Sequence, residues 1–256
     1  MTSHGTLVLV PNTLDLGSAE GEAPDLREVL ADGVIRRAAA LSHWAAEDAR
    51  STRAFLKRVG AVHPLALPVQ QIEIRELPRP AKGRPASGDD AAAWDALLAP
   101  ALQGHDMGLI SEAGLPGVAD PGAALVAAAH RHGLRVDPLP GPTSLALALA
   151  ASGLNGQSFA FVGYLPQDAA ARQTRLRELE ALSRRLQQTQ LFIETPYRNA
   201  ALMQALVATL SPATRLSVSS GLTLPDAWTR TDTVEGWRRV PKVPSDRRPT
   251  VFALLA

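Results

Sequence analysis

The sequence predicts an α/β protein of two domains, and three observations support this fold class. Short apolar or β-branched runs alternate with helical segments through the first 154 residues, which is typical of a mostly parallel sheet with helices on both faces. After residue 154 the strand-like runs crowd together toward the C-terminus, which indicates a mixed sheet with helices. The stretch "SGLNGQ" separates the two patterns. We therefore predict an N-terminal α/β domain at 1–154 and a C-terminal α/β domain at 155–256.

Each predicted element of the first domain has a local signal. The run "GTLVLVP" at 5–11 ends in a proline and predicts a buried first strand, followed by a loop at 12–25. Asp25 is a candidate N-cap for a helix over 26–40, and Gly60 closes a helix over 49–60. A Pro/Gly-rich run predicts an exposed loop at 77–90. Similar signals predict strands at 41–48, 106–111 and 134–139, and helices at 91–102, from about residue 121, and at 145–153.

The second domain shows the same kinds of signal in a different order. A long helix rich in arginine is predicted at 169–187, and a second helix at 198–210. Strands are predicted at 159–165, 190–195, 215–222, 227–234 and 249–256.

Composition limits the class of protein. Hydrophobic residues make up 46% and charged residues 20% of the chain, as in soluble globular proteins. The chain has no cysteine, which excludes disulfides and a cysteine nucleophile. No apolar run approaches the ~20 residues that span a bilayer, and we see no signal peptide. We therefore expect a cytoplasmic protein with no membrane partner.

The two halves differ in charge. Residues 1–154 carry 13 Lys/Arg and 17 Asp/Glu, a net charge of −4, and residues 155–256 carry 13 and 8, a net charge of +5. A basic second half indicates either a polyanionic partner or only a solvated basic face. Aromatic residues are 4% of the chain, so stacking on nucleic-acid bases is not an obvious theme.

Several common catalytic motifs are absent from the sequence. There is no Walker-type phosphate loop, no G-x-S-x-G nucleophile elbow, and no G-x-G-x-x-G after the first strand. The six histidines are scattered, so we expect no metal site.

Two loops carry most of the unusual residues. "SEAGLPGVADPG" at 111–122 and "PLPGPTS" at 138–144 each follow a predicted strand and precede a helix of small residues. Loops at the carboxyl ends of parallel strands line the ligand crevice, and glycines there let backbone groups approach a ligand. Neither loop contains Lys or Arg, which favours a zwitterionic small molecule over a polyphosphate. Alternatively both loops are tight connectors, with Asp120 as the N-cap and Pro121 as the first residue of a helix.

The motifs together resemble the RsmI-type branch of the tetrapyrrole methylase superfamily. The resemblance rests on "LISEAGLPGVADPG" and "VDPLPGPTS", and on "GTLVLVP", "AAEDARSTRAFLKRVG", "VGYLP", "FIETPYRN" and "PTVFALLA" in the order that the family has them. It implies a two-domain class III methyltransferase that binds S-adenosyl-L-methionine between its domains. Members of that branch methylate the ribose 2′-oxygen of a cytidine in small-subunit ribosomal RNA, and the resemblance also implies a homodimer.

The resemblance implies roles for particular residues. The residues that it places at the cofactor are Pro11, Ile110, Ser111, Glu112, Gly114, Leu115, Gly141, Thr143, Ser144 and Gly221. A hydroxyl acceptor must lose a proton during methyl transfer, so a base or a nearby positive charge would help. Our candidates for that catalytic role are Asp48, Glu194 and Arg198, with Arg50 as an anchor for an anion.

The chain also departs from the family pattern. Its first loop reads "NTLDLGS" where the family has T-P-I-G-N-L-G-D, and "SGLTLP" lacks the Arg, Glu and Lys of the family's R-E-L-T-K. Three functions therefore stay open: an RNA ribose methyltransferase, which we favour, a small-molecule methyltransferase acting on a tetrapyrrole, and a ribosome-associated protein that binds the cofactor without catalysis.

Overall fold

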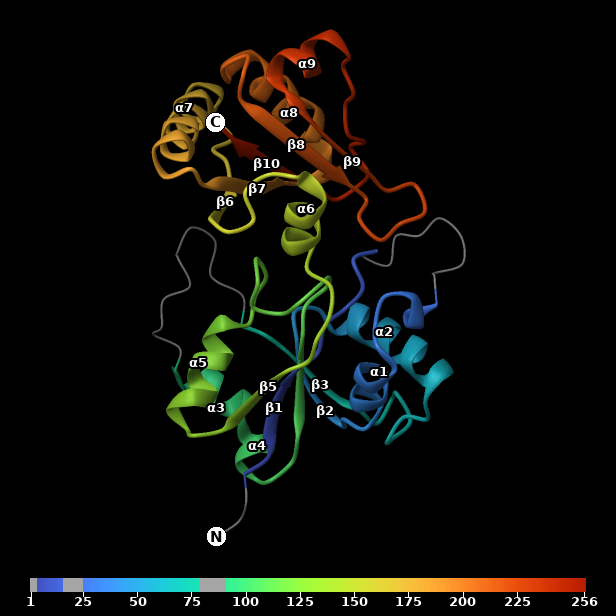
Figure 1. The fold of residues 1–256 in the computed structure, drawn as a ribbon. Helices are drawn as coiled ribbons and strands as arrows, with labels where there is room; N and C mark the ends of the chain where they lie inside the picture. Colours follow the sequence, from blue (N-terminus) through green and yellow to red (C-terminus); the bar gives the residue numbers. More distant parts are fainter. Residues whose placement is uncertain (1–3, 16–24, 79–90) are drawn as a thin grey trace. The chain divides into compact units, whose positions relative to one another are not determined.

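The computed structural model describes residues 4–15, 25–78 and 91–256. It confirms the predicted α/β class, with two five-stranded sheets, and the chain divides into two compact units, Met1–Thr143 and Ser144–Ala256. The predicted loop at 77–90, apart from its first two residues, and most of the predicted loop at 12–25 lie outside the described residues. Figure 1 shows the two units and labels their elements.

The first unit is built on a parallel sheet with the strand order β3-β2-β4-β1-β5. Its strands are β1 (Thr6–Leu9), β2 (His43–Ala46), β3 (Glu73–Glu76), β4 (Met107–Ile110) and β5 (Arg135–Pro138). Its helices are η1 (Leu26–Glu28), α1 (Asp32–Ala39), α2 (Ala49–Val62), α3 (Ala91–Leu97), α4 (Ala99–Leu102) and α5 (Ala123–Arg131).

Both faces of this sheet are covered, as the apolar strands predict. On one face Val8 and Trp44 pack with residues of α1 and α2, and on the other Leu7 and Leu109 pack with residues of α4 and α5. In Figure 1, α1 and α2 lie on one side of the strands and α3 and α5 on the other. Because the strands are all parallel, the loops that follow them emerge at one edge of the sheet.

The second unit has a mixed sheet with the strand order β6-β7-β10-β8-β9. Only the β6–β7 pair is parallel, while β7–β10, β10–β8 and β8–β9 are antiparallel. The strands are β6 (Phe159–Tyr164), β7 (Thr189–Glu194), β8 (Arg215–Ser220), β9 (Trp228–Thr233) and β10 (Thr250–Leu255). The helices are α6 (Ser144–Ser152), α7 (Ala169–Leu186), η3 (Pro196–Arg198), α8 (Asn199–Thr209) and α9 (Val234–Arg239).

The division between the units falls before helix α6, whereas the sequence places the boundary after it, at 154/155. The reason is packing. Ala148 of α6 is buried with Leu191, Val251 and Ala253 of the second sheet. The helix therefore belongs to the second unit, although its sequence continues directly from the loop of the first.

Candidate active site at the carboxyl edge of the parallel sheet

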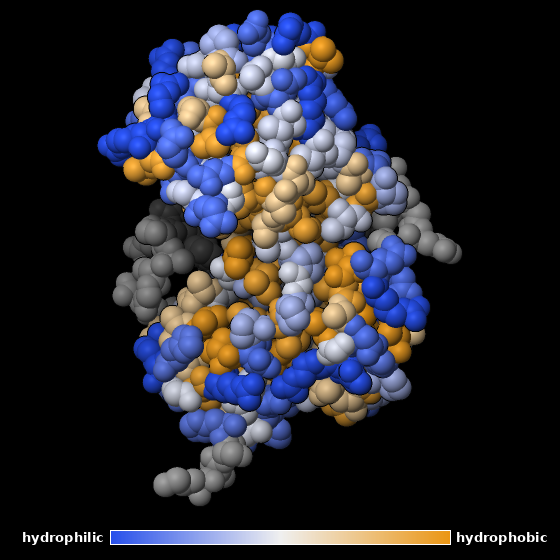
Figure 2. Space-filling model, viewed as in Figure 1, coloured by the Kyte–Doolittle hydropathy of each residue, from blue (hydrophilic) through white to orange (hydrophobic). Residues whose placement is uncertain are grey.

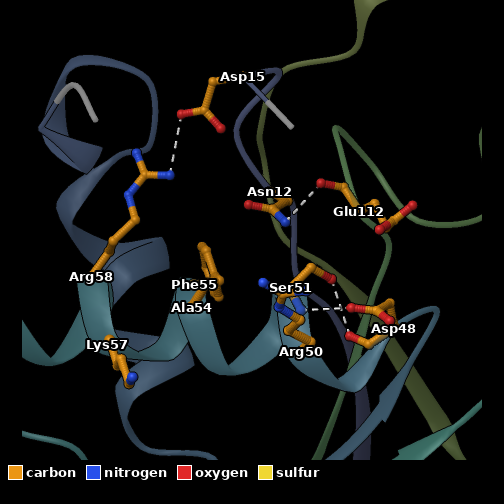
Figure 3. Close-up of a pocket in the computed structure, with 10 residues that line it drawn as sticks. All are labelled: Asn12, Asp15, Asp48, Arg50, Ser51, Ala54, Phe55, Lys57, Arg58 and Glu112. Carbon is orange, nitrogen blue, oxygen red and sulfur yellow. Dashed lines mark hydrogen bonds and ion pairs between the residues drawn. The ribbon is translucent and has the colours of Figure 1, made fainter. Parts of the chain in front are cut away.

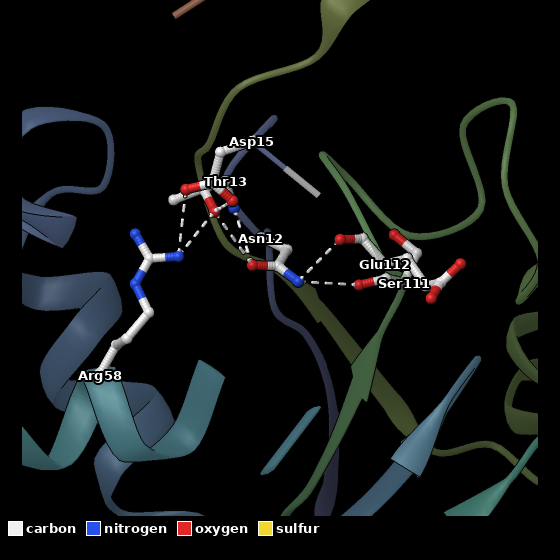
Figure 4. A network of polar contacts seen from close by, with 6 residues as sticks. All are labelled: Asn12, Thr13, Asp15, Arg58, Ser111 and Glu112. Carbon is white, nitrogen blue, oxygen red and sulfur yellow. Dashed lines mark hydrogen bonds and ion pairs between the residues drawn. The ribbon is translucent and has the colours of Figure 1, made fainter. Parts of the chain in front are cut away.

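Hydrogen bonds join the loops that follow β1 and β4. The backbone N–H of Asn12 donates to the Gly114 carbonyl at 2.8 Å, and the two residues form an isolated β-bridge. The side-chain Nδ2 of Asn12 donates to the carbonyl oxygens of Ser111 at 3.2 Å and Glu112 at 3.1 Å (Figure 4). Asn12 is buried, so these contacts help to fix the position of the loop after β4.

The loop after β5 closes over the loop after β1. A Cβ atom added at Gly141 would lie 2.2 Å from the Cβ of Pro11, so glycine is needed for the close approach of these two loops. Gly114 has a φ of +69°, a conformation that L-residues with side chains rarely adopt. From the sequence we expect these glycines to make room for a ligand. At Gly141 the position that a Cβ atom would take is occupied by Pro11, so this glycine serves the packing of the loops.

A pocket of about 720 Å³ opens beside the joined loops. That volume is within the range of small-molecule sites. Figure 3 shows the residues that line it: Asn12, Asp15, Asp48, Arg50, Ser51, Ala54, Phe55, Lys57, Arg58 and Glu112. Its wall carries both acidic and basic side chains, with the basic ones all on α2.

An ion pair crosses one end of this pocket. The Nη1 of Arg58 lies 3.2 Å from Oδ2 of Asp15, whose side chain is 4% exposed. The hydroxyl of Thr13 donates to Oδ1 of the same carboxylate at 2.9 Å. Figure 4 shows this network beside the contacts of Asn12. The pair connects α2 to the loop after β1, so two elements distant in sequence hold the shape of the pocket wall.

Asp48 lies where β2 leads into α2, and it caps the helix. Its Oδ1 accepts a hydrogen bond from the backbone N–H of Ser51 at 2.7 Å. A carboxylate at the start of a helix is also stabilised by the helix dipole. Asp48 lines the pocket described above and also a second pocket. Its side chain therefore faces the site although it caps the helix.

A second pocket of about 550 Å³ contains Asp120. Burial, followed by the charge of Glu47, raises the pKa of Asp120 to about 6, and the nearby charge of Glu112 acts in the same direction. Ser111 opposes this shift by hydrogen bonding to the Asp120 side chain. Glu47 is held in place because its Oε2 accepts a hydrogen bond from the Glu112 N–H at 3.0 Å.

The alternative that Asp120 caps a helix is wrong. Helix α5 begins at Ala123, two residues after Pro121, and its N-cap is Gly122, with a φ of 129° and no side-chain cap. Asp120 instead lies among other carboxyl groups, where its proton is held more tightly than that of an ordinary aspartic acid.

Of the predicted cofactor residues, most of those in the first unit lie at this edge of the sheet. Ile110 ends β4 and is buried, Ser111 is buried directly after it, and Leu115 is half-buried in the following loop. Of the predicted residues, Glu112, Asp48 and Arg50 line the larger pocket. Thr143 is the last residue of the first unit, and Ser144 begins α6 in the second.

The remaining predicted site residues lie in the second unit. The Glu194 side chain at the end of β7 is 2% exposed, and its Oε1 lies 2.8 Å from Nη2 of Arg198. The same oxygen accepts a hydrogen bond from the Thr195 N–H at 2.7 Å. Gly221 has a φ of +65°, and its N–H donates to the Pro249 carbonyl at 2.9 Å. The structure thus brings Glu194 and Arg198 together, and their catalytic role stays a prediction.

Sequence reasoning missed Asn12, Asp15 and Arg58 as site residues. Asn12 directly follows the predicted first strand and Asp15 lies in the loop after it, a position that could have singled them out. Arg58 gave no such signal, because its contact with Asp15 joins residues 43 apart in the chain. Within the described residues, no group of three or more His, Cys, Asp or Glu is arranged to hold a metal ion. No helix among those residues is long and apolar enough to cross a membrane.

Comparison with known proteins identifies similar sequences. A family model described as Tetrapyrrole (Corrin/Porphyrin) Methylases matches residues 29–236. The chain is 41% identical over 127 residues to Ribosomal RNA small subunit methyltransferase I of Mesorhizobium japonicum, an alignment covering 50% of this chain and 42% of the relative. It is 35% identical over 173 residues to the protein of that name from Xylella fastidiosa, covering 68% of this chain and 55% of the relative. The chain thus spans about half the length of the curated relatives it matches.

Solved structures with the same fold are more distant in sequence. The methyltransferase CobJ superimposes with a TM-score of 0.56 at 16% identity, covering 97% of this chain and 93% of CobJ. A uroporphyrin-III C-methyltransferase from Thermus thermophilus, complexed with S-adenyl homocysteine, has a TM-score of 0.51 at 18% identity, covering 98% of this chain and 97% of that one. At these identities the likeness shows the fold.

Proposed function

The chain belongs to the tetrapyrrole (corrin/porphyrin) methylase family, and from this we propose that it transfers a methyl group from S-adenosyl-L-methionine to RNA. The acceptor we propose is the ribose 2′-oxygen of a cytidine in small-subunit ribosomal RNA. The observation that carries this choice is the 41% identity over 127 residues to a protein named Ribosomal RNA small subunit methyltransferase I. The homodimer and the cytoplasmic location implied for the chain stay predictions.

The donor set of the larger pocket fits this cofactor. S-adenosylmethionine carries a sulfonium, an ammonium and a carboxylate, and it supplies an electrophilic methyl group when bound. Asp48 and Glu112 provide negative charge for the two cationic groups, while Arg50 and Lys57 on α2 provide positive charge for the carboxylate. We propose that this mixed wall, together with the joined loops, holds the cofactor in the first unit.

Methyl transfer to a hydroxyl needs alignment and the removal of one proton. When bound, the cofactor would supply the methyl group to the ribose oxygen and be left as its neutral thioether, and a base of the protein would accept the proton of that oxygen. Holding the two reactants in line contributes up to roughly 7–11 kcal/mol to catalysis. We retain Asp48 as a candidate base because its side chain faces the pocket, and Glu194 and Arg198 as candidates from the second unit.

Charge supports an RNA acceptor over a neutral one. The second unit carries 13 Lys/Arg and 8 Asp/Glu, a net charge of +5. On the face drawn in Figure 2, hydrophilic side chains cover the region of α7 and α9. Helix α7 alone contributes Arg172, Arg175, Arg177, Arg184 and Arg185. Such a surface attracts the phosphate backbone and gives an affinity that falls steeply with salt.

Two measurements test the proposal. Calorimetry should detect binding of S-adenosylmethionine to the purified chain, and Glu112→Gln should weaken binding about 5- to 10-fold through loss of one charge near the cofactor. Glu235→Gln, an exposed acid in the second unit, is the control and should bind as the wild type does. The absence of heat at millimolar ligand would contradict every methyltransferase function for this chain.

The second measurement identifies the acceptor. Labelled methyl groups should be transferred to small ribosomal subunits purified from a strain that lacks this gene. A uroporphyrinogen-type tetrapyrrole is assayed in parallel. Label on the tetrapyrrole alone would establish the small-molecule function, and binding of the cofactor without label on either would favour the non-catalytic one.

A further inference from the structure

Three aromatic side chains on β6 are exposed to solvent. Phe159 is 53% exposed, Phe161 36% and Tyr164 59%. The chain has only five phenylalanines and two tyrosines, so three of these seven residues lie on one short strand. Leaving a large aromatic side chain in water forgoes about 1.5–3 kcal/mol of burial. A contiguous group of such residues marks a site of interaction more often than a defect of the core.

A β-bulge places all three rings on one face of the sheet. Phe159, Phe161 and Tyr164 pair in register with Thr189, Leu191 and Ile193 of β7. Three positions separate Phe161 from Tyr164, so a regular strand would turn them to opposite faces. The register shift between them absorbs one residue, and Gly163, with a φ of +75°, lies inside it. Bulges with such a glycine commonly redirect a side chain.

The side chain of Val162 on β6 points the other way. Val162 packs against the core formed by residues of α7, α8 and the sheet, while the aromatic rings lie on the face that carries α6. Helix α6 packs on β8, β9 and β10. The aromatic stripe, defined here as Phe159, Phe161 and Tyr164, therefore borders the covered part of this face along the edge strand.

We propose that the aromatic stripe binds unpaired bases of a single-stranded RNA by stacking, an inference that rests on the proposed RNA acceptor. Side chains two residues apart on a strand are about 6.7 Å apart. Bases in a stacked strand are about 3.4 Å apart. Successive rings can therefore each take one base only if the RNA segment is unstacked, as it is in loops and single-stranded ends.

The size of the stripe favours RNA over a second protein copy. Three aromatic rings about half exposed offer roughly 300 Å² of apolar surface. A stable protein–protein interface needs about 800 Å² on each partner. A few bases need no more than the stripe provides, and the net charge of +5 on the same unit complements a polyanion.

The carboxyl end of the stripe leads toward more aromatic and cationic groups. Tyr164 pairs with Ile193, which is followed by Glu194 at the end of β7. Three residues later Tyr197 is 70% exposed, and the guanidinium of Arg198 lies 5.3 Å from the centre of its ring. An RNA strand that lies along β6 would thus approach the ion pair of Glu194 and Arg198, which are candidates for the catalytic role.

The test measures RNA binding by the full chain. A fluorescein-labelled, unstructured RNA of ten nucleotides and mixed sequence is titrated with protein, and anisotropy reports the affinity. Loss of a stacking ring weakens binding about 5- to 150-fold, so the double variant Phe159→Ala, Phe161→Ala should fall at least into this range. Its salt dependence should match that of the wild type, because no phosphate contact is removed. Phe161→Trp keeps a stacking ring at this position and should bind RNA as the wild type does.

Leu186→Ala is the matched control. Leu186 is an apolar residue that is 48% exposed, and it lies on α7, which packs on the face of the sheet opposite the stripe. It should bind RNA as the wild type does. Wild-type affinity in the double variant would overturn the inference. A wild type that sediments as a dimer and a double variant that sediments as a monomer would also overturn the inference, because the stripe would then bind a second copy of the chain. RNA binding that depends on the stripe without methyl transfer would refute the proposed function and leave this inference standing.

Discussion

Replacement of Asp120 by asparagine should stabilise the protein above pH 6. Burial and the charge of Glu47 raise the pKa of Asp120 from its ordinary 3.8 to about 6. Between pH 4 and 6 the folded protein holds a proton that the unfolded chain has released, so the free energy of unfolding falls as pH rises through this window. Above pH 6 the ionised carboxylate destabilises the fold by its full amount, and asparagine removes that charge.

The size of the effect follows from the shift. The difference between 3.8 and about 6 corresponds to about 3 kcal/mol. Asp120 is half-buried, so water screens part of this energy and we expect about 1–2 kcal/mol. At pH 4 the carboxyl group is protonated in the folded protein and about half protonated in the unfolded chain, so the variant should differ from the wild type by less than about 1 kcal/mol.

Urea unfolding at pH 4 and pH 8 measures this difference. Asp137→Asn, on β5 of the same sheet, controls for the general effect of removing one negative charge. Glu47→Gln should lower the pKa of Asp120 and reduce the pH dependence in the otherwise unchanged protein. Equal stability of wild type and Asp120→Asn at pH 8, or a less stable variant, would refute the electrostatic reasoning.

Three further predictions follow from the site. Gly141→Ala should separate the loops after β1 and β5, because its Cβ would lie 2.2 Å from the Cβ of Pro11; calorimetry should show loss of cofactor binding, and retained affinity would contradict the joined-loop site. Arg198→Ala should cost about 3 kcal/mol in urea unfolding by leaving buried Glu194 without its cation, while Arg198→Lys costs less; a loss below about 0.5 kcal/mol would disprove this. Replacing the exposed Arg184 and Arg185 of α7 together by alanine should reduce the slope of log affinity for single-stranded RNA against log salt by up to about 1.4; an unchanged slope would exclude them from phosphate contact.

Local patterns predicted most of the fold because most strands of the two sheets are short runs rich in apolar or β-branched residues with clear ends. Strand β3 was missed because "EIRE" has a single apolar residue and lies at the edge of the sheet. The predicted helix at 91–102 is divided between α3 and α4, with Pro100 in the first turn of α4. Helix α6 packs on the second sheet, and its uniformly apolar sequence does not show which sheet it covers.

Two of the predicted cofactor and catalytic residues lie at the larger pocket. Glu112 and Asp48 each come shortly after a strand of the parallel sheet, and both line the pocket. Contacts between distant residues could not be predicted from one sequence. The close approach of Gly141 to Pro11 joins residues 130 apart in the chain, and the aromatic stripe depends on a bulge that only the register with β7 reveals.

The most direct test of the central claim is the identity of the methylated nucleoside. Small ribosomal subunits from a strain lacking this gene are incubated with the protein and labelled S-adenosylmethionine, and their RNA is digested to nucleosides for mass spectrometry. We predict that the label appears in 2′-O-methylcytidine. Label in a base-methylated nucleoside, or no label in RNA from a protein that binds the cofactor, would contradict the proposed ribose methyltransferase.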